Sequence, residues 1–120
     1  MTDSQKKLKA LKSVVQLQFD LAQARLHKHA AEREVTRALI AGLDRPSRLA
    51  GEDPILSAQV DLVYQSWADG RRAELNTILA RQTAIWMESV SEARQCFGKM
   101  DALRQVATRL AVREARSEAD

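Results

Sequence analysis

Helix-breaking residues are concentrated in one short part of this 120-residue chain. Both prolines, Pro46 and Pro54, lie there with Gly51 between them, and Gly42 comes just before. Residues 3–41 contain neither glycine nor proline, and only two glycines interrupt the sequence after Pro54. Because proline and glycine are the residues that most disfavour a helix interior, the chain is predicted to form two long helices joined by one connector.

Composition favours narrow contacts between helices over a deep globular core. Hydrophobic residues make up 45% of the chain, but aromatic residues only 4%, and the apolar set consists mainly of Ala, Leu and Val. Such side chains fill the contact between two paired helices well. At 120 residues the chain has the length of one domain, so we expect residues 1–120 to form a single helical domain.

The first helix is predicted over residues 3–43, with Asp3 or Ser4 as the N-terminal cap. Apolar residues recur there at intervals of three and four on one broad face, opposite a polar face. That face contains Leu8, Leu11, Val14, Val15, Phe19, Leu21, Ala22, Leu26, Leu39, Ile40 and Leu43. Polar residues enter this face between His29 and Arg37, so packing is expected to be looser there.

The connector is predicted over residues 44–53, and the second helix over residues 54–117. Asp53 can cap this helix, and Pro54 suits its first position, where no backbone N–H is needed. The helix carries an apolar heptad pattern, which is typical of a coiled coil. The pattern runs through Leu75, Leu79, Gln82, Trp86, Ser89, Ala93, Cys96, Met100, Leu103, Ala107 and Leu110, and Ile78, Ile85, Val90 and Phe97 widen it.

The predicted fold class is therefore all-α, an antiparallel coiled-coil hairpin of two long helices. Gly70 leaves two alternatives open, because glycine costs about 1 kcal/mol relative to alanine inside a helix. In one, the second helix is kinked but continuous. In the other, it breaks near Gly70, and residues 55–68 fold back as a third packed helix.

The two helices differ in predicted length, which leaves part of the longer one without a partner. Counting back from the connector, the first helix ends opposite residues 95–97 of the second. The tail of the second helix would then project, and its apolar side chains would stay uncovered, as is usual for a surface that binds a partner. We interpret this tail as a binding surface formed by Phe97, Met100, Leu103, Val106 and Leu110.

The net charge of +3 comes from the first helix, where Lys6, Lys7, Lys9 and Lys12 lie close together. In an antiparallel hairpin these lysines lie at the same end as the predicted tail. They are expected to attract an acidic protein partner toward the apolar surface. Basic residues of the second helix are interleaved with acids, which argues against nucleic-acid binding.

Motifs for catalysis, cofactors and metals are missing from the sequence. It contains neither GxxxxGK[ST] nor GxGxxG, so no nucleotide-binding loop is predicted. His27 and His29 point to opposite sides of a helix and cannot hold one metal ion together. Cys96 has no histidine within a helical turn to activate it. We therefore expect no cofactor and no enzymatic activity.

Two runs of the second helix resemble FliJ-type proteins, the coiled-coil components of the flagellar type III export apparatus. They are Arg72-Ala-Glu-Leu-Asn-Thr-Ile-Leu-Ala-Arg-Gln and Ser91-Glu-Ala-Arg-Gln-Cys-Phe-Gly-Lys-Met-Asp-Ala-Leu-Arg, and the basic opening Lys6-Lys-Leu-Lys-Ala-Leu-Lys is also similar. The resemblance implies a two-helix stalk seated in the export ATPase, which links it to the membrane export gate and to substrate chaperones. The chain departs from the family in being short and in its proline-containing connector.

The sequence thus leads to one functional hypothesis and one alternative. The first is a non-catalytic adaptor of flagellar protein export, and the alternative is a helical scaffold or chaperone-like protein that binds amphipathic helices. Self-association is a further option for either. No signal-peptide core and no transmembrane stretch is evident, so a cytoplasmic location is expected, with peripheral association at the inner membrane through partners.

Overall fold

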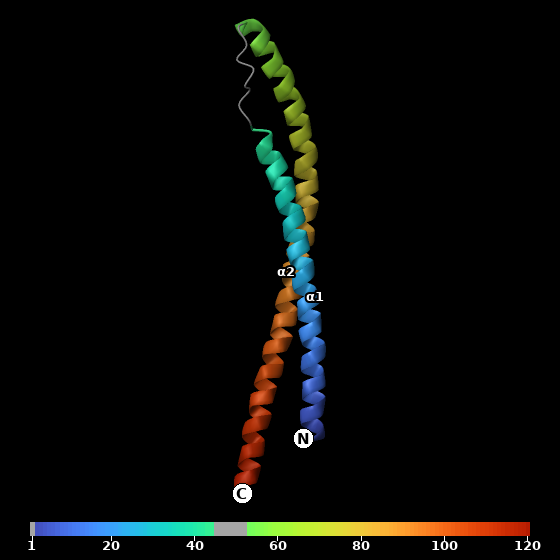
Figure 1. Cartoon of the computed structure of the whole chain (residues 1–120), viewed down its shortest axis with the longest axis vertical. Helices are drawn as coiled ribbons and strands as arrows, with labels where there is room; N and C mark the ends of the chain where they lie inside the picture. Colours follow the sequence, from blue (N-terminus) through green and yellow to red (C-terminus); the bar gives the residue numbers. More distant parts are fainter. Residues whose placement is uncertain (1, 45–52) are drawn as a thin grey trace. The chain divides into compact units, whose positions relative to one another are not determined.

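The computed structural model describes residues 2–44 and 53–120 of the chain, and it is an all-α helical hairpin. Helix α1 extends over Asp3–Gly42, and helix α2 over Pro54–Ala119. Both are drawn as continuous ribbons in Figure 1, and no strand occurs among the described residues. The predicted helices are confirmed to within two residues at each end. Most of the predicted connector, residues 45–52, lies outside the described residues.

Both helices begin at capped N-termini. The Asp53 carboxylate accepts a hydrogen bond from the Ile55 amide at 3.0 Å, so Asp53 caps α2 as predicted, with Pro54 at the first helical position. At α1 the prediction of Asp3 or Ser4 was wrong, because Thr2 is the cap. The Thr2 hydroxyl accepts from the Gln5 amide, and the Gln5 side chain accepts in return from the Thr2 amide, both at 3.2 Å. Thr2 and Gln5 therefore form a reciprocal capping box.

Helix α2 continues through Gly70 without a break. The alternative in which residues 55–68 fold back as a separate third helix is therefore wrong. A Cβ atom placed at Gly70 would meet nothing within 4 Å, and no described glycine has a positive φ. Gly70 thus adopts an ordinary helical conformation at an open position, and the modest propensity cost of one glycine does not end a helix of 66 residues.

The chain forms two compact units, and in each the two helices run antiparallel. The first comprises residues 1–28 with 87–120, and the second residues 29–86. In the first unit, Gln5 hydrogen-bonds to Glu114 at 2.6 Å, and Arg25 pairs with Glu92. In the second, Arg33 bonds to Thr83 and Arg72 pairs with Asp44, both at 3.0 Å. As residue numbers rise along α1, those of its partners on α2 fall.

These pairs contradict the predicted projecting tail. The start of α1 lies beside Glu114, so α1 reaches nearly to the end of α2. At the other end, Asp44 lies opposite Arg72. The prediction assumed that pairing starts at the first residue of α2, whereas the end of α1 lies well inside α2, near Arg72. The helix without an α1 partner is therefore at the connector end of α2.

The buried residues form one narrow heptad stripe on each helix, which we call the inner stripe. On α2 every residue of the predicted heptad pattern from Leu75 to Leu110 is buried or half-buried. On α1 the broad apolar face divides in two. Its buried or half-buried members are Leu8, Val15, Phe19, Ala22, Leu26, Ile40 and Leu43, whereas Leu11, Val14, Leu21 and Leu39 are exposed. Ile78, Ile85 and Phe97, which were expected to widen the α2 pattern, are also exposed.

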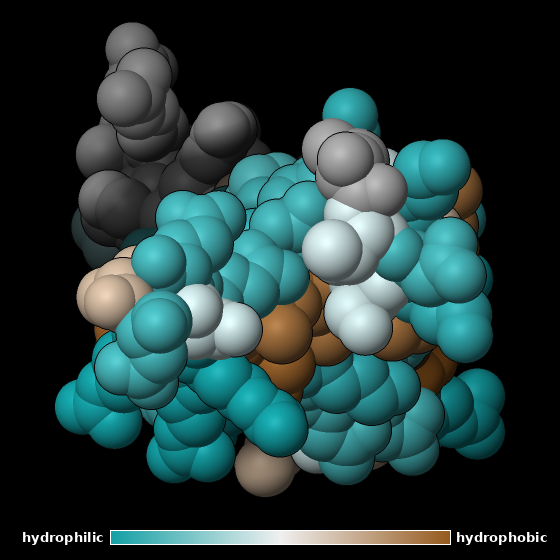
Figure 2. Space-filling view, turned by 90° about the horizontal axis from the view of Figure 1, so that it is seen from below, coloured by the Kyte–Doolittle hydropathy of each residue, from teal (hydrophilic) through white to brown (hydrophobic). Residues whose placement is uncertain are grey.

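Small residues allow close packing in the first unit. Ala22 is 0% exposed and packs with Ala93 and Cys96, and Phe19 and Leu26 pack against this cluster. Seen from the side of the two chain termini, hydrophilic residues form most of the surface, and hydrophobic residues appear between them (Figure 2). Among the described residues no large side chain is fully buried, so small side chains and close approach carry much of the packing.

Enlarging Ala22 should destabilise the hairpin. Ala22→Leu inserts a side chain where no space is left, and overpacking of this kind costs about 1 to 3 kcal/mol. Ala24→Leu is the matched control, since Ala24 is exposed two residues away on the same helix. Urea denaturation followed by circular dichroism measures both. Equal midpoints for the two variants would show that Ala22 does not lie in a close-packed layer.

Candidate protein-binding surfaces

The described residues offer surfaces for proteins and no arrangement for a metal. No group of three or more His, Cys, Asp or Glu side chains among them could hold a metal ion. Neither described helix has a segment long and apolar enough to cross a membrane. Two surface regions remain as candidates: the basic end of the first unit, and the first turns of α2.

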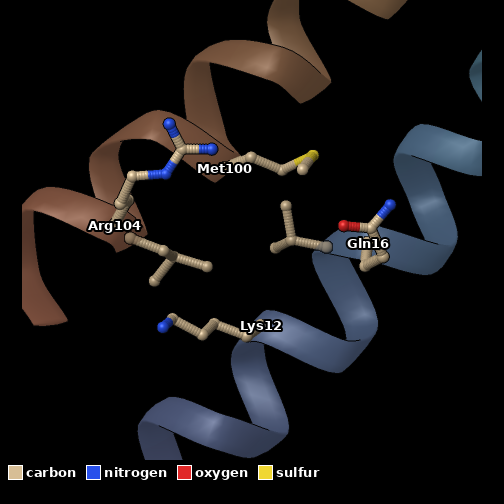
Figure 3. A pocket seen from close by; sticks show the side chains of 6 residues that line it. Lys12, Gln16, Met100 and Arg104 are labelled. Carbon is tan, nitrogen blue, oxygen red and sulfur yellow. The ribbon is translucent and has the colours of Figure 1, made fainter.

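The basic end contains the four predicted lysines, Lys6, Lys7, Lys9 and Lys12, and all are exposed. The apolar residues predicted beside them divide into two groups. Met100, Leu103 and Leu110 belong to the inner stripe and are half-buried. Met100 and Leu103 line a shallow hollow between the helices, together with Lys12, Val15, Gln16 and Arg104. Lys12 and Gln16 extend from α1, and Met100 and Arg104 from α2, around its apolar centre (Figure 3).

Phe97 and Val106 are the two predicted apolar residues that stay exposed. The ring of Phe97 lies 6.3 Å from that of Phe19, tilted by 50°, which holds Phe97 at the edge of the inner stripe. The structure therefore places the four lysines in the same unit as Phe97 and Val106. These six exposed residues of the first unit are accessible to a partner, and we call them together the basic surface. The other three apolar residues mainly hold the helices together.

The second candidate is the exposed segment, residues 54–67 of α2, which the sequence analysis missed. Ile55, Val63 and Leu62 are 72%, 71% and 70% exposed, the highest values among the described large hydrophobic residues. Leu56 and Trp67 are also exposed, each at 58%. A signal was present in the sequence: apolar residues occur on several sides of this segment, and residues 53–70 contain three aspartates but no lysine or arginine.

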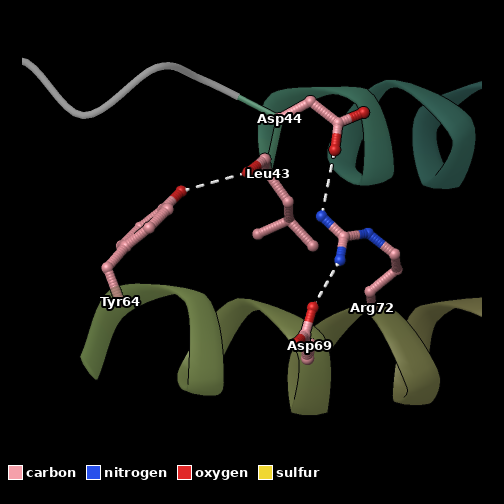
Figure 4. A network of polar contacts seen from close by, with 5 residues as sticks. All are labelled: Leu43, Asp44, Tyr64, Asp69 and Arg72. Carbon is pink, nitrogen blue, oxygen red and sulfur yellow. Dashed lines mark hydrogen bonds and ion pairs between the residues drawn. The ribbon is translucent and has the colours of Figure 1, made fainter. Parts of the chain in front are cut away.

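A polar network fixes where α1 ends on α2 and so where the exposed segment lies. The Arg72 guanidinium donates to Asp44 at 3.0 Å and to Asp69 at 2.8 Å. The Tyr64 hydroxyl donates to the Leu43 carbonyl at 3.4 Å, so Tyr64 and Arg72 of α2 both contact the two residues that follow α1 (Figure 4). Exposed ion pairs of this kind contribute about 0 to 1 kcal/mol each, so this network sets register more than stability.

A polar layer interrupts the inner stripe of the second unit. The Arg33 guanidinium lies 5.0 Å from the centre of the Trp86 ring, and its Nε atom donates to the Thr83 hydroxyl at 3.0 Å. Thr36 is buried, and its hydroxyl donates to the Glu32 carbonyl. One oxygen of Gln82 is buried without a hydrogen-bond partner. Arg33 and Thr36 lie in the region where polar residues were predicted on the apolar face, although Thr36 is buried and not loosely packed.

No protein-family model, no curated protein and no solved structure gave a significant match.

Alanine substitutions of the two tryptophans test whether the polar layer or the exposed segment contributes more to the stability of the fold. Trp86→Ala removes a half-buried ring under Arg33, and we expect a loss of roughly 2 to 3 kcal/mol in unfolding free energy, below the range for fully buried aromatics. Trp67→Ala should cost less than about 1 kcal/mol, because that ring is mostly exposed. Thermal and urea unfolding measure both. A larger loss for Trp67→Ala would mean that the exposed segment is held by contacts within the chain.

Proposed function

We propose that this chain is a non-catalytic coiled-coil adaptor of the bacterial flagellar type III protein export apparatus. In this proposal its basic surface contacts the export ATPase and the export gate, and substrate chaperones are further partners. The observation that carries the proposal is the antiparallel pairing of two long helices, which is the stalk architecture that the FliJ-type resemblance implies. The adaptor would act in the cytoplasm and at the inner membrane through its partners.

The basic surface fits a role in recruiting an acidic partner. Long-range attraction by Lys6, Lys7, Lys9 and Lys12 raises the rate of association, whereas close apolar contacts slow dissociation. Phe97 and Val106 are available for such contacts because they are exposed. The basic surface therefore combines both requirements on one unit of the chain.

A helical scaffold or chaperone-like protein is the second candidate, and the exposed segment favours it. A helix that shows several large apolar residues to solvent can bind an amphipathic helix of another protein. Such a scaffold would use residues 54–67 and not the basic surface. The two candidates thus predict different effects for substitutions at the two surfaces.

Binding assays with purified partners test the adaptor role. We expect the wild-type chain to bind an export ATPase and a gate domain. Changing Lys6, Lys7, Lys9 and Lys12 together to Glu should mainly slow association. The double variant Phe97→Glu with Val106→Glu should mainly speed dissociation. The matched controls are Arg81→Glu and Val112→Glu, which change exposed residues elsewhere. Surface plasmon resonance gives both rates.

Two results would contradict the adaptor proposal. One is a folded wild-type chain that binds neither the ATPase nor the gate domain. The other is binding that is equally strong for the variants and the controls. Loss of binding on changing Leu62 and Val63 to Ser, with the basic surface intact, would favour the scaffold instead.

A further inference from the structure

Helix α1 carries a second heptad stripe beside the inner one. Within the first unit it consists of Lys7, Leu11, Val14, Gln18, Leu21, Arg25 and Lys28, spaced alternately by four and three residues, and every member is exposed. We call it the outer stripe. Leu11, Val14 and Leu21 form its apolar part, and three basic residues flank them. A helix with two such stripes is typical of a bundle of more than two helices, because each stripe packs against a different neighbour.

The exposed segment of α2 has the same spacing. Leu56, Val60, Val63 and Trp67 follow one another at intervals of four, three and four residues, and three of the four are exposed. Stripes with this alternating spacing can pack side by side as in a coiled coil. The outer stripe and the exposed segment are therefore matched in pattern, although they belong to different units of the chain.

The charges of these two surfaces are opposite. The exposed segment has one charged residue, Asp61, whereas the outer stripe contains three basic residues and no acid. Of those three, Arg25 also pairs with Glu92 of its own chain. Asp61 lies in the middle of the exposed segment and has a buried carboxylate oxygen without a hydrogen-bond partner. Two copies of this chain thus hold complementary surfaces, and attraction between them favours this pairing over contact between like surfaces.

The exposed apolar side chains also favour an assembly of more than one copy. Large apolar side chains that lie together on a surface are usual where a protein partner binds. Covering the exposed segment would remove the most exposed apolar side chains of α2 from water. Covering the outer stripe would do the same for Leu11, Val14 and Leu21 of α1.

We propose that the chain self-associates, with the exposed segment of one copy packed on the outer stripe of α1 in a second copy. When both copies exchange this contact, the assembly is a closed dimer with two-fold symmetry, the commonest form of soluble oligomer. The contact buries Val63 and Trp67 against Leu11, Val14 and Leu21. It places the acidic Asp61 of one copy against the basic outer stripe of the other. The proposal is independent of the flagellar function.

Sedimentation velocity with the full chain tests this contact at about 50 mM and about 500 mM salt. We expect the wild-type chain to have an apparent mass of twice 13.4 kDa and to dissociate more readily at the higher salt concentration. The segment variant, Leu62→Ser with Val63→Ser, and the stripe variant, Leu11→Ser with Val14→Ser, should each dimerise at least about tenfold more weakly. Leu17→Ser and Val112→Ser, exposed residues outside both surfaces, are the controls.

Mixing the two variants identifies the surfaces that meet. Each variant alone lacks one side of every contact, but a mixed dimer regains one complete contact. The mass of the mixture should therefore exceed the average of the two separate samples. A mixture whose mass equals that average overturns the proposed pairing. A wild-type chain that stays monomeric at about 100 μM overturns self-association altogether. Circular dichroism confirms that each variant remains helical.

Discussion

One narrow line of contact, the inner stripe, is the constraint on which the whole hairpin depends. Two paired helices have no third layer behind them, so every apolar side chain outside that line faces solvent. Ala22, Ala93 and Cys96 let the backbones approach closely, but no large side chain among the described residues is fully buried. Stability must therefore come from many partial contacts along the helices, and each addition or loss of volume on the inner stripe affects its neighbours.

A repeating stripe raises the question of what selects one register, since a slip of seven residues keeps apolar residues opposite each other. Polar pairs supply the answer, although each is weak in itself. In the observed register Arg25 meets Glu92, and Arg72 meets Asp44. A slip of seven residues in one direction would place Arg25 opposite Lys99, and a slip in the other would place Arg72 opposite Arg37. The alternatives are disfavoured by repulsion as well as by lost attraction.

The sequence predicted the parts of this fold that follow from local rules. The two helices, the cap at Asp53 and the heptad pattern of α2 depend on spacing and on capping chemistry, which are visible along one segment. The position of the uncovered helix depends on register between distant residues, so counting from the connector placed it at the wrong end. The same limit applied to α1, where spacing alone could not separate the inner stripe from Leu11, Val14 and Leu21. The basic end could be predicted because it depends only on where lysines occur in the sequence and on the antiparallel direction of the helices. Its four lysines are exposed.

The pairing of Asp44 with Arg72 also has a consequence for how the chain meets other molecules. Because α1 ends at Gly42, residues 54–71 continue α2 beyond the part that lies opposite α1 in register. Most of the stability of a helix in a protein comes from covering its apolar face. The exposed segment is continuous with the long paired part of α2. The helix therefore extends into it without a separate, costly nucleation step. It is thus held in helical form while its apolar side chains remain exposed, which reduces the ordering cost of binding a matching stripe.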